Sequence, residues 1–275
     1  MKSFILLIGD EGALLYPPSH IKKEPLFMST HEKDSFSHIR TMLDEAPHMA
    51  VHILVDIRTQ HIRKEDHPAL SYFDRKKLLE RRIKQAFPKT RLRSVLPQNK
   101  TEAILISLDE TPLLETYLDL LRNVKNPLSG ISLLPCELES LVSKLIPNPS
   151  SHWCMLLLYQ QTGGFRQIVT HKGKLIFTRL TPPLPETTSA DFVEERLTQD
   201  ILATRNYLGR FGLKRRSKFS VVAIMPAHLS TLTLDHCEAT ILSPSNAAHQ
   251  IHLPYPHHWN NGADLLSLLW ARASF

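Results

Sequence analysis

Glycine is scarce in this chain of 275 residues. Only 9 residues are glycine, which is about 3%, less than half of the usual share near 7%. No three of them fit the spacing G-x-G-x-x-G, and no pair fits G-x-x-x-x-G-K-[ST]. Both patterns need glycines so that backbone N–H groups can approach phosphate. The sequence therefore excludes a Rossmann dinucleotide loop and a P-loop.

Cysteines and long apolar runs are also few. The three cysteines, Cys136, Cys154 and Cys237, are odd in number and far apart, which excludes a disulfide framework and a cysteine zinc site. We expect them to be buried, reduced thiols. The longest apolar stretches, among them Phe4–Ile8, fall far below the roughly 18 residues of a membrane span. The N-terminus shows no signal-peptide pattern.

The composition is that of a globular protein with a basic surface. Hydrophobic residues make up 42% of the chain and charged residues 22%, so a sizeable core is expected and disorder is not. The length suits one large domain or two of roughly 130 residues each. The net charge of +6 is compatible with an acidic partner, an anionic membrane or nucleic acid.

Each half of the chain begins with a hairpin or meander and continues with alternating helices and strands. In the first half, strands are predicted at 4–8, 13–16, 52–57, 103–107 and 130–134, and helices at 35–43, 75–87, 112–124 and 135–145. Residues 19–33 read as irregular, and 146–151 as a linker. In the second half, strands are predicted at 153–159, 165–170, 174–179, 219–224, 239–242 and 250–253, and helices at 189–210 and 263–272. This order indicates a duplicated α/β architecture.

Two stretches resemble the actin-like proteins of type IV pilus and type II secretion assembly, the PilM/GspL group. One is the run from Gly164 to Arg179 followed by a helix that carries Thr204 and Tyr207, and the other is Leu105–Glu137. The resemblance implies a two-lobed actin-like (RNase H-like) fold with mixed sheets flanked by helices. We expect the first lobe at residues 1–150 and the second at 151–275.

The resemblance also implies a nucleotide site between two hairpin turns. Asp10 and Gly12 lie in the first turn, and Gly163 and Gly164 lie in the second. The second turn has no acid, because no Asp or Glu occurs from 140 to 185, and the glycine pair expected near adenosine is missing. We expect a degenerate site, no catalytic residues and no cofactor. An ordinary hairpin turn also explains Asp10 and Gly12, and bound ATP with Mg²⁺ is the alternative.

A dense basic cluster runs from Arg75 to Arg93, and most of it lies on the helix predicted at 75–87. Its docking candidates, for an acidic partner or anionic lipid, are Arg75, Lys77, Arg81, Arg82 and Lys84. A solvated helix face is the alternative reading. A nucleic-acid interface is disfavoured because aromatic residues are not interleaved with these cations. A second basic group, at 214–218, reads as a solvated loop. Of the 15 histidines, His48 and His52 have i, i+4 spacing but straddle the end of a predicted helix, so no metal site is expected.

The resemblance implies a non-catalytic cytoplasmic scaffold at the inner face of the bacterial inner membrane. Its implied partners are an assembly ATPase and an inner-membrane pilus or secretion protein, with an anionic membrane surface and a second copy of the chain as further candidates. The alternatives are an ATP-binding phosphotransferase or ATPase of the same fold, and a basic nucleic-acid-binding module.

Overall fold

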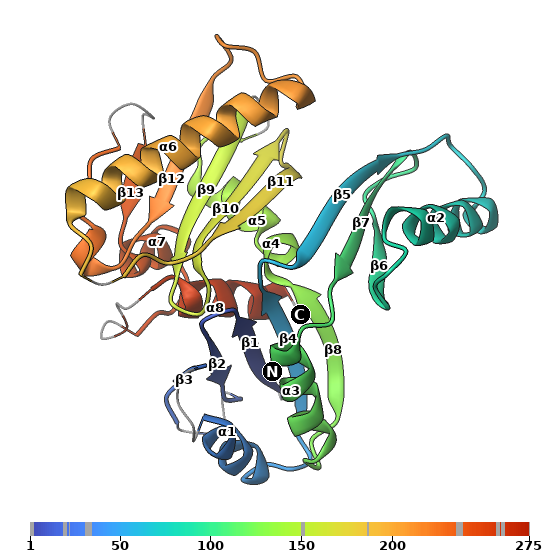
Figure 1. Ribbon diagram of the computed structural model, residues 1–275, viewed down its shortest axis with the longest axis vertical. Coiled ribbons are helices and arrows are strands. Elements are labelled where there is room, and N and C mark those ends of the chain that lie inside the picture. Colours follow the sequence, from blue (N-terminus) through green and yellow to red (C-terminus); the bar gives the residue numbers. More distant parts are fainter. Residues whose placement is uncertain are drawn as a thin grey trace. The chain divides into compact units, whose positions relative to one another are not determined.

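The chain folds into two compact units, and the smaller one is inserted in the sequence of the larger. The computed structural model describes residues 3–18, 21, 23–30, 35–149, 152–185, 187–234, 239–256, 259 and 262–274. The larger unit comprises Met1–Asp56 and Lys125–Phe275, and the smaller unit comprises Ile57–Val124 (Figure 1).

The first sheet of the larger unit has the strand order β3-β2-β1-β4-β8. Its strands are β1 (Ser3–Gly9), β2 (Gly12–Tyr16), β3 (Leu26–Ser29), β4 (Ala50–Asp56) and β8 (Leu128–Leu133). The first three form an antiparallel meander, and β4 and β8 run parallel to β1. Helix α1 (Ser35–Asp44) confirms the helix predicted at 35–43. Strand β3, which precedes it, lies in a segment for which we expected irregular structure.

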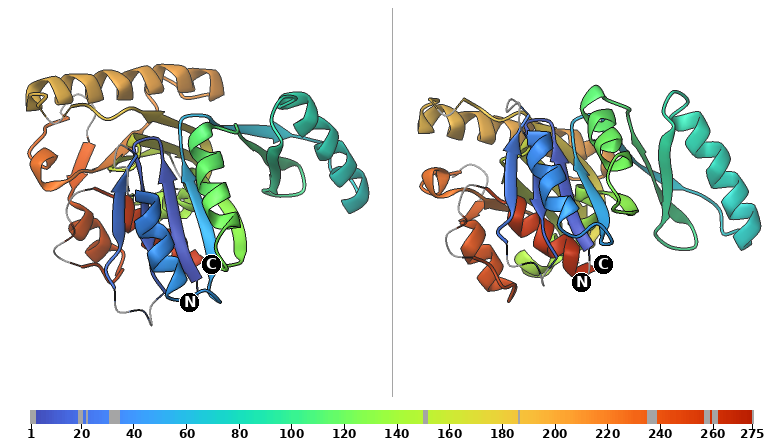
Figure 2. Two further views of the ribbon diagram at one scale, coloured as in Figure 1. Left: turned by 60° about the horizontal axis from the view of Figure 1, so that its bottom comes forward. Right: turned by 90° about the horizontal axis from the view of Figure 1, so that it is seen from below.

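The second sheet repeats this plan with the order β11-β10-β9-β12-β13. Its strands are β9 (Trp153–Gln160), β10 (Gly164–His171), β11 (Lys174–Thr181), β12 (Phe219–Ile224) and β13 (Ala239–Leu242). Again an antiparallel meander is followed by two parallel strands. Helix α6 (Ala190–Leu208) crosses one face (Figure 2), where Val193, Leu197 and Ile201 join the core. The predicted α/β architecture of mixed sheets flanked by helices is confirmed.

Short helices complete the larger unit. They are α4 (Leu134–Glu137), α5 (Glu139–Leu145), α7 (Pro244–Gln250) and α8 (Asp264–Ser274), with the 3₁₀ turns Gly209–Phe211 and Ala227–Leu229. Helix α8 contacts β1 and β2, and α5 contacts β9 and β10. The single helix predicted at 135–145 is instead broken at Leu138. The strand predicted at 250–253 is wrong, because Gln250 ends α7 and His252 has a left-handed φ of 55°.

The smaller unit contains a three-stranded antiparallel sheet with the order β5-β7-β6. Its elements are β5 (Gln60–Asp66), α2 (Tyr72–Ala86), β6 (Leu92–Pro97), β7 (Glu102–Leu108) and α3 (Pro112–Arg122). Helix α2 packs on the sheet through Leu79 and Ile83, which meet Ala103 and Leu105 of β7. Of these three strands, the sequence predicted only β7.

Side-chain caps fix where the long helices begin. The Thr111 hydroxyl accepts from the N–H of Leu114 at the start of α3, as its Thr-Pro pair predicts. Helix α2 starts earlier than expected, because Ser71 caps it by accepting from the N–H of Asp74.

No helix in the described ranges is long and apolar enough to cross a membrane. The strands of the two sheets fall within 3–133 and 153–242, and the lobe boundary at residue 150 stays a prediction.

Candidate functional site

The two predicted nucleotide turns lie in the larger unit and touch each other. The N–H of Glu11, between β1 and β2, donates to the carbonyl oxygen of Thr162, between β9 and β10, at 2.8 Å. A Cβ atom on Gly9 would overlap that same carbonyl. Absence of a side chain at Gly9 therefore allows the turns to meet backbone to backbone.

The four residues predicted for this site occupy the two turns. Asp10 is half-buried beside Glu11, and Gly12 begins β2, where a Cβ atom would lie 2.6 Å from the carbonyl oxygen of Met28. A Cβ atom on Gly163 would lie 3.1 Å from the carbonyl oxygen of Asp56. Gly164 begins β10 with a φ of +105°, a conformation that favours glycine. These glycines serve close backbone packing and tight turns.

Asp264, the first residue of α8, binds the second turn. Its carboxylate accepts from the N–H of Gln161 at 2.6 Å, the N–H of Thr162 at 2.9 Å and the Thr162 hydroxyl at 2.7 Å. Burial raises the pKa of Asp264, while the hydrogen bonds from Thr162 and Gln161 oppose that rise. Nothing local in the sequence indicated this residue, because it lies about a hundred positions after the turn that it holds.

A buried ion pair lies beside the turns. Arg166 of β10 contacts Asp56, which lies at the end of β4. Nε of Arg166 donates to Oδ1 of Asp56 at 2.7 Å, and Nη2 lies 2.6 Å from the same oxygen. The two side chains are 2% and 0% exposed, and Nη1 of Arg166 also donates to the Thr178 hydroxyl. The charge of this strand-end carboxylate is thus balanced by an arginine of the same unit.

Together these contacts define what the turns offer to a ligand. The N–H groups of Glu11, Gln161 and Thr162 all have protein acceptors. A phosphate cradle needs such N–H groups to point at the ligand. In the part of the chain that the structure describes, no group of three or more His, Cys, Asp or Glu side chains is placed to hold a metal ion.

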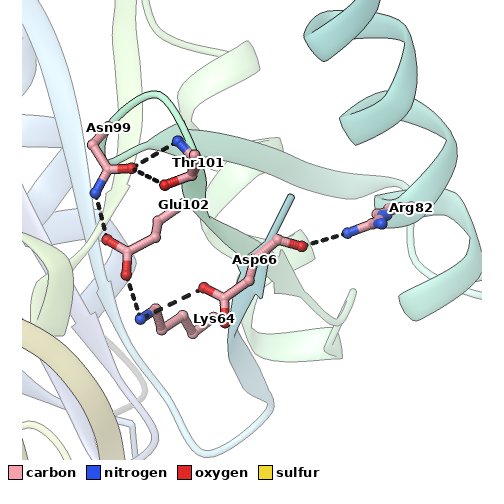
Figure 3. Close-up of polar contacts among 6 residues, drawn as sticks. All are labelled: Lys64, Asp66, Arg82, Asn99, Thr101 and Glu102. Carbon is pink, nitrogen blue, oxygen red and sulfur yellow. Dashed lines mark hydrogen bonds and ion pairs between the residues drawn. The ribbon is translucent and has the colours of Figure 1, made fainter. Parts of the chain in front are cut away.

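The predicted basic docking residues all lie on α2, but they do not act alike. Arg82 forms an ion pair with Glu65. It also donates to the carbonyl oxygen of Asp66 at 2.7 Å (Figure 3), so it joins α2 to β5. Lys64 is likewise engaged, by Glu102 at 2.6 Å and by Asp66 at 3.6 Å (Figure 3). The hydrogen bond from Lys64 to Glu102 raises the lysine pKa.

A groove of about 400 Å³ is lined by residues of α2 and β6. Leu79, Ile83 and Val95 supply its apolar part. The cations that line it are Arg75, Lys76, Lys84 and Arg93, and the acid is Glu80. Of the predicted docking residues, Arg75 and Lys84 therefore face the groove, whereas Lys77 and Arg81 are exposed outside it. Lys76 and Arg93 belong to the basic cluster of the sequence, but they were not among its docking candidates. Strand β6, which carries Arg93, was not predicted.

The groove borders a sheet edge. Strand β6 pairs with β7 on one side and is the last strand of its sheet among the described residues. Beside it, Tyr72 lines the groove and is 64% exposed, and its neighbour Phe73 is 73% exposed. An edge strand with an adjacent apolar cleft can bind an extended chain by strand addition.

The sequence matches no protein-family model and no curated protein. Among solved structures, the PilM–PilN type IV pilus biogenesis complex is similar over 99% of this chain and 98% of that chain, with a TM-score of 0.68 and 13% identity. The cytoplasmic domain of EpsL, an inner membrane component of the type II secretion system of Vibrio cholerae, is similar over 90% and 92%, with a TM-score of 0.53 and 11% identity.

These likenesses define the class of fold. The chain has an actin-like α/β fold. Its resemblance to the PilM/GspL group, predicted from the sequence, is confirmed at the level of the fold.

Proposed function

We propose that this chain is a non-catalytic scaffold of a type IV pilus or type II secretion machine, at the cytoplasmic face of the inner membrane. The likeness to PilM and to the EpsL domain supports the type of machine. The observation that carries the non-catalytic role is the engagement of the turn N–H groups by Asp264 and Thr162.

Nucleotide binding would have to undo these contacts. A phosphate at the second turn would compete with the Asp264 carboxylate for the N–H groups of Gln161 and Thr162, and the two negative charges would repel each other. The usual second carboxylate for Mg²⁺ is absent from that turn in the sequence. We therefore infer that neither ATP nor Mg²⁺ is a cofactor of this chain.

Thermal unfolding with and without Mg-ATP tests this inference. A ligand at about 100 times its Kd adds about 2.7 kcal/mol to the free energy of unfolding, which raises Tm by several degrees for a chain of this size. We expect Mg-ATP at about 5 mM to shift Tm by less than about 1 °C. A shift of several degrees that Asp10→Ala abolishes would show that the turns hold nucleotide, and the scaffold proposal would fail.

The docking surface of the scaffold is the groove between α2 and β6. Three features support it: an edge strand, an apolar floor, and four cations against the single acid Glu80. An extended, acidic segment of the inner-membrane partner fits all three. An assembly ATPase and a second copy of this chain are the other partners that the scaffold role implies.

Co-purification from cells that express the tagged, full chain tests the groove. We expect the wild type to recover an inner-membrane pilus or secretion protein, and Lys76→Glu/Lys84→Glu to lose it. The matched control is Lys77→Glu/Arg81→Glu, which changes the same helix by the same charge outside the groove and should retain the partner. Equal loss in both variants would contradict the groove, and recovery of neither partner class by the wild type would contradict the scaffold.

A further inference from the structure

The end of α6 carries a second basic surface, and it differs from the one on α2. Between residues 201 and 234 the chain has no Asp or Glu. The α6-end patch is the group of six cations in this stretch: Arg205, Arg210, Lys214, Arg215, Arg216 and Lys218. All except the half-buried Arg205 are exposed. The preceding acid, Asp200, is buried and pairs with Arg179 and Arg196.

Backbone contacts hold this patch in a defined shape. After the 3₁₀ turn, Gly212 takes a φ of +97° and the N–H of Leu213 returns to the carbonyl oxygen of Leu208 at 3.2 Å. Nη2 of Arg205 donates to the carbonyl oxygen of Arg215 at 3.2 Å. Arg205, Lys214 and Arg215 thus line one hollow of about 540 Å³, and Figure 1 shows the following turn projecting beyond the helix.

The six cations of the patch differ from the paired cations of the smaller unit. Among the described residues, no ion pair joins any of the six to an acid. On the smaller unit, by contrast, Arg82 is paired with Glu65, and Lys64 with Glu102. The α6-end patch therefore presents a positive field of one sign, which attracts a polyanionic surface.

Apolar side chains are exposed within the same patch. Leu202, Tyr207 and Phe211 are 39%, 40% and 45% exposed. The Tyr207 ring lies 5.0 Å from that of Phe177 and 5.6 Å from that of Phe211, and the Arg210 guanidinium lies 5.4 Å from its centre. Aromatic rings beside lysine and arginine are the composition that favours the interface between lipid headgroups and acyl chains.

We propose that the α6-end patch docks this chain on the surface of an anionic phospholipid bilayer. Lysine and arginine near such a surface each gain attraction from its negative potential, and Phe211 with Leu202 can enter the headgroup region. Single-stranded nucleic acid fits less well, because base stacking needs open ring faces and the Tyr207 ring already has the rings of Phe177 and Phe211 and the Arg210 guanidinium beside it.

Vesicle sedimentation with the full chain tests this proposal. The probes are vesicles of phosphatidylcholine alone and vesicles with about 30% phosphatidylglycerol. We expect binding only to the anionic vesicles, and a steep loss of binding as salt rises from about 50 to about 500 mM. Lys214→Glu/Arg215→Glu should lower the partition coefficient at least about tenfold. The control Lys77→Glu/Arg81→Glu should change it less than about twofold, and thermal unfolding should show that both variants are folded.

Two further measurements separate the bilayer from other polyanions. Phe211→Trp should show a blue-shifted emission with anionic vesicles and no shift with phosphatidylcholine alone. Binding to a DNA duplex or single strand at the same salt is the competing outcome. No binding to anionic vesicles, equal loss in both charge variants, or nucleic-acid binding without vesicle binding would overturn the proposal. None of these results depends on whether the groove of the smaller unit binds a protein.

Discussion

Arg166 is only 1% exposed, and among the described residues no larger side chain is buried as completely. Its partner is Asp56, and the sequence predicted that this acid lies near the end of the strand at 52–57. The pairing itself could not be predicted, because the two residues are 110 positions apart and neither pattern signals the other. Burying two charges is costly unless each neutralises the other, so this pair fixes how β4 and β10 come together.

Removing one member of this pair should strongly destabilise the larger unit. Asp56→Ala leaves a buried guanidinium without its carboxylate, and we expect a loss of about 3–5 kcal/mol in the free energy of unfolding. Arg166→Met should lower the free energy of unfolding by a similar amount, because it leaves the buried Asp56 carboxylate without its guanidinium. The double variant should lose clearly less than the sum of the two single losses, measured by urea denaturation. Additive losses would mean that the two side chains do not interact.

A histidine between two parallel strands gives the fold a sensitivity to acid. The His52 ring of β4 lies 3.0 Å, through Nε2, from the Ser132 hydroxyl of β8, and burial lowers its pKa. The unfolded chain therefore binds the proton more readily than the folded chain does. The contribution of His52 to stability is thus present above the unfolded pKa near 6.5 and is lost as pH falls from there toward the lower, folded pKa.

The variant His52→Gln tests this prediction, because an amide does not titrate. We expect the free energy of unfolding of the wild type, relative to His52→Gln, to fall between pH 7.5 and 5.0. Urea titrations at several pH values measure this difference. A constant difference across that range would show that His52 titrates alike in the folded and unfolded chains.

At the scale of elements, the sequence predicted correctly those helices and strands that have one apolar face or are apolar throughout. The meander β9–β11, strand β4 and helices α1, α3 and α6 were predicted because their apolar periodicity is strong. Strands β5 and β6 were missed, since Gln60–Asp66 is mostly polar and its sheet has a small core under one helix. The groove beside β6 could therefore not be predicted from the sequence, although the basic residues that line it were part of a recognised basic cluster.

The first residue of helix α8, Asp264, holds the turn between β9 and β10. Asp264 connects this helix to the turn between β9 and β10, so Asp264→Ala would leave two backbone N–H groups and the Thr162 hydroxyl without their acceptor. Each unsatisfied buried donor costs about 1–3 kcal/mol, and we expect a total loss of at least about 2 kcal/mol in chemical denaturation.

The control is the same change at Asp191, an exposed acid in the first turn of α6. It should cost only the interaction with the helix dipole, about 0.3–1 kcal/mol. If Asp264→Ala were as mild as Asp191→Ala, the carboxylate would not be holding the turn, and the N–H groups of Gln161 and Thr162 would be available to a ligand.

At the scale of the whole molecule, the sequence predicted that each half begins with a hairpin or meander and continues with alternating helices and strands. It predicted the state of the nucleotide site only in part. The missing acids and glycines indicated a degenerate nucleotide site, and this stays a prediction. What occupies the turn N–H groups was not visible, because it depends on an acid from the last helix and on contact between turns about 150 residues apart. One contact between the two sheets of the larger unit is thus made backbone to backbone, and it requires a residue without a side chain.

Gly9 is that residue, and replacing it tests the contact directly. An added Cβ atom would overlap backbone atoms of Thr162, which cannot rotate away as a side chain can. We expect Gly9→Ala to lower the free energy of unfolding by about 1–3 kcal/mol, measured by urea denaturation. Gly209→Ala is the matched control, because its φ of −53° is helical and nothing lies within 4 Å of its added Cβ. That change should be neutral or slightly stabilising. If Gly9→Ala were equally harmless, the turns would stand apart and leave room for a phosphate, so the same measurement bears on the contact and on the proposal that the chain binds no nucleotide.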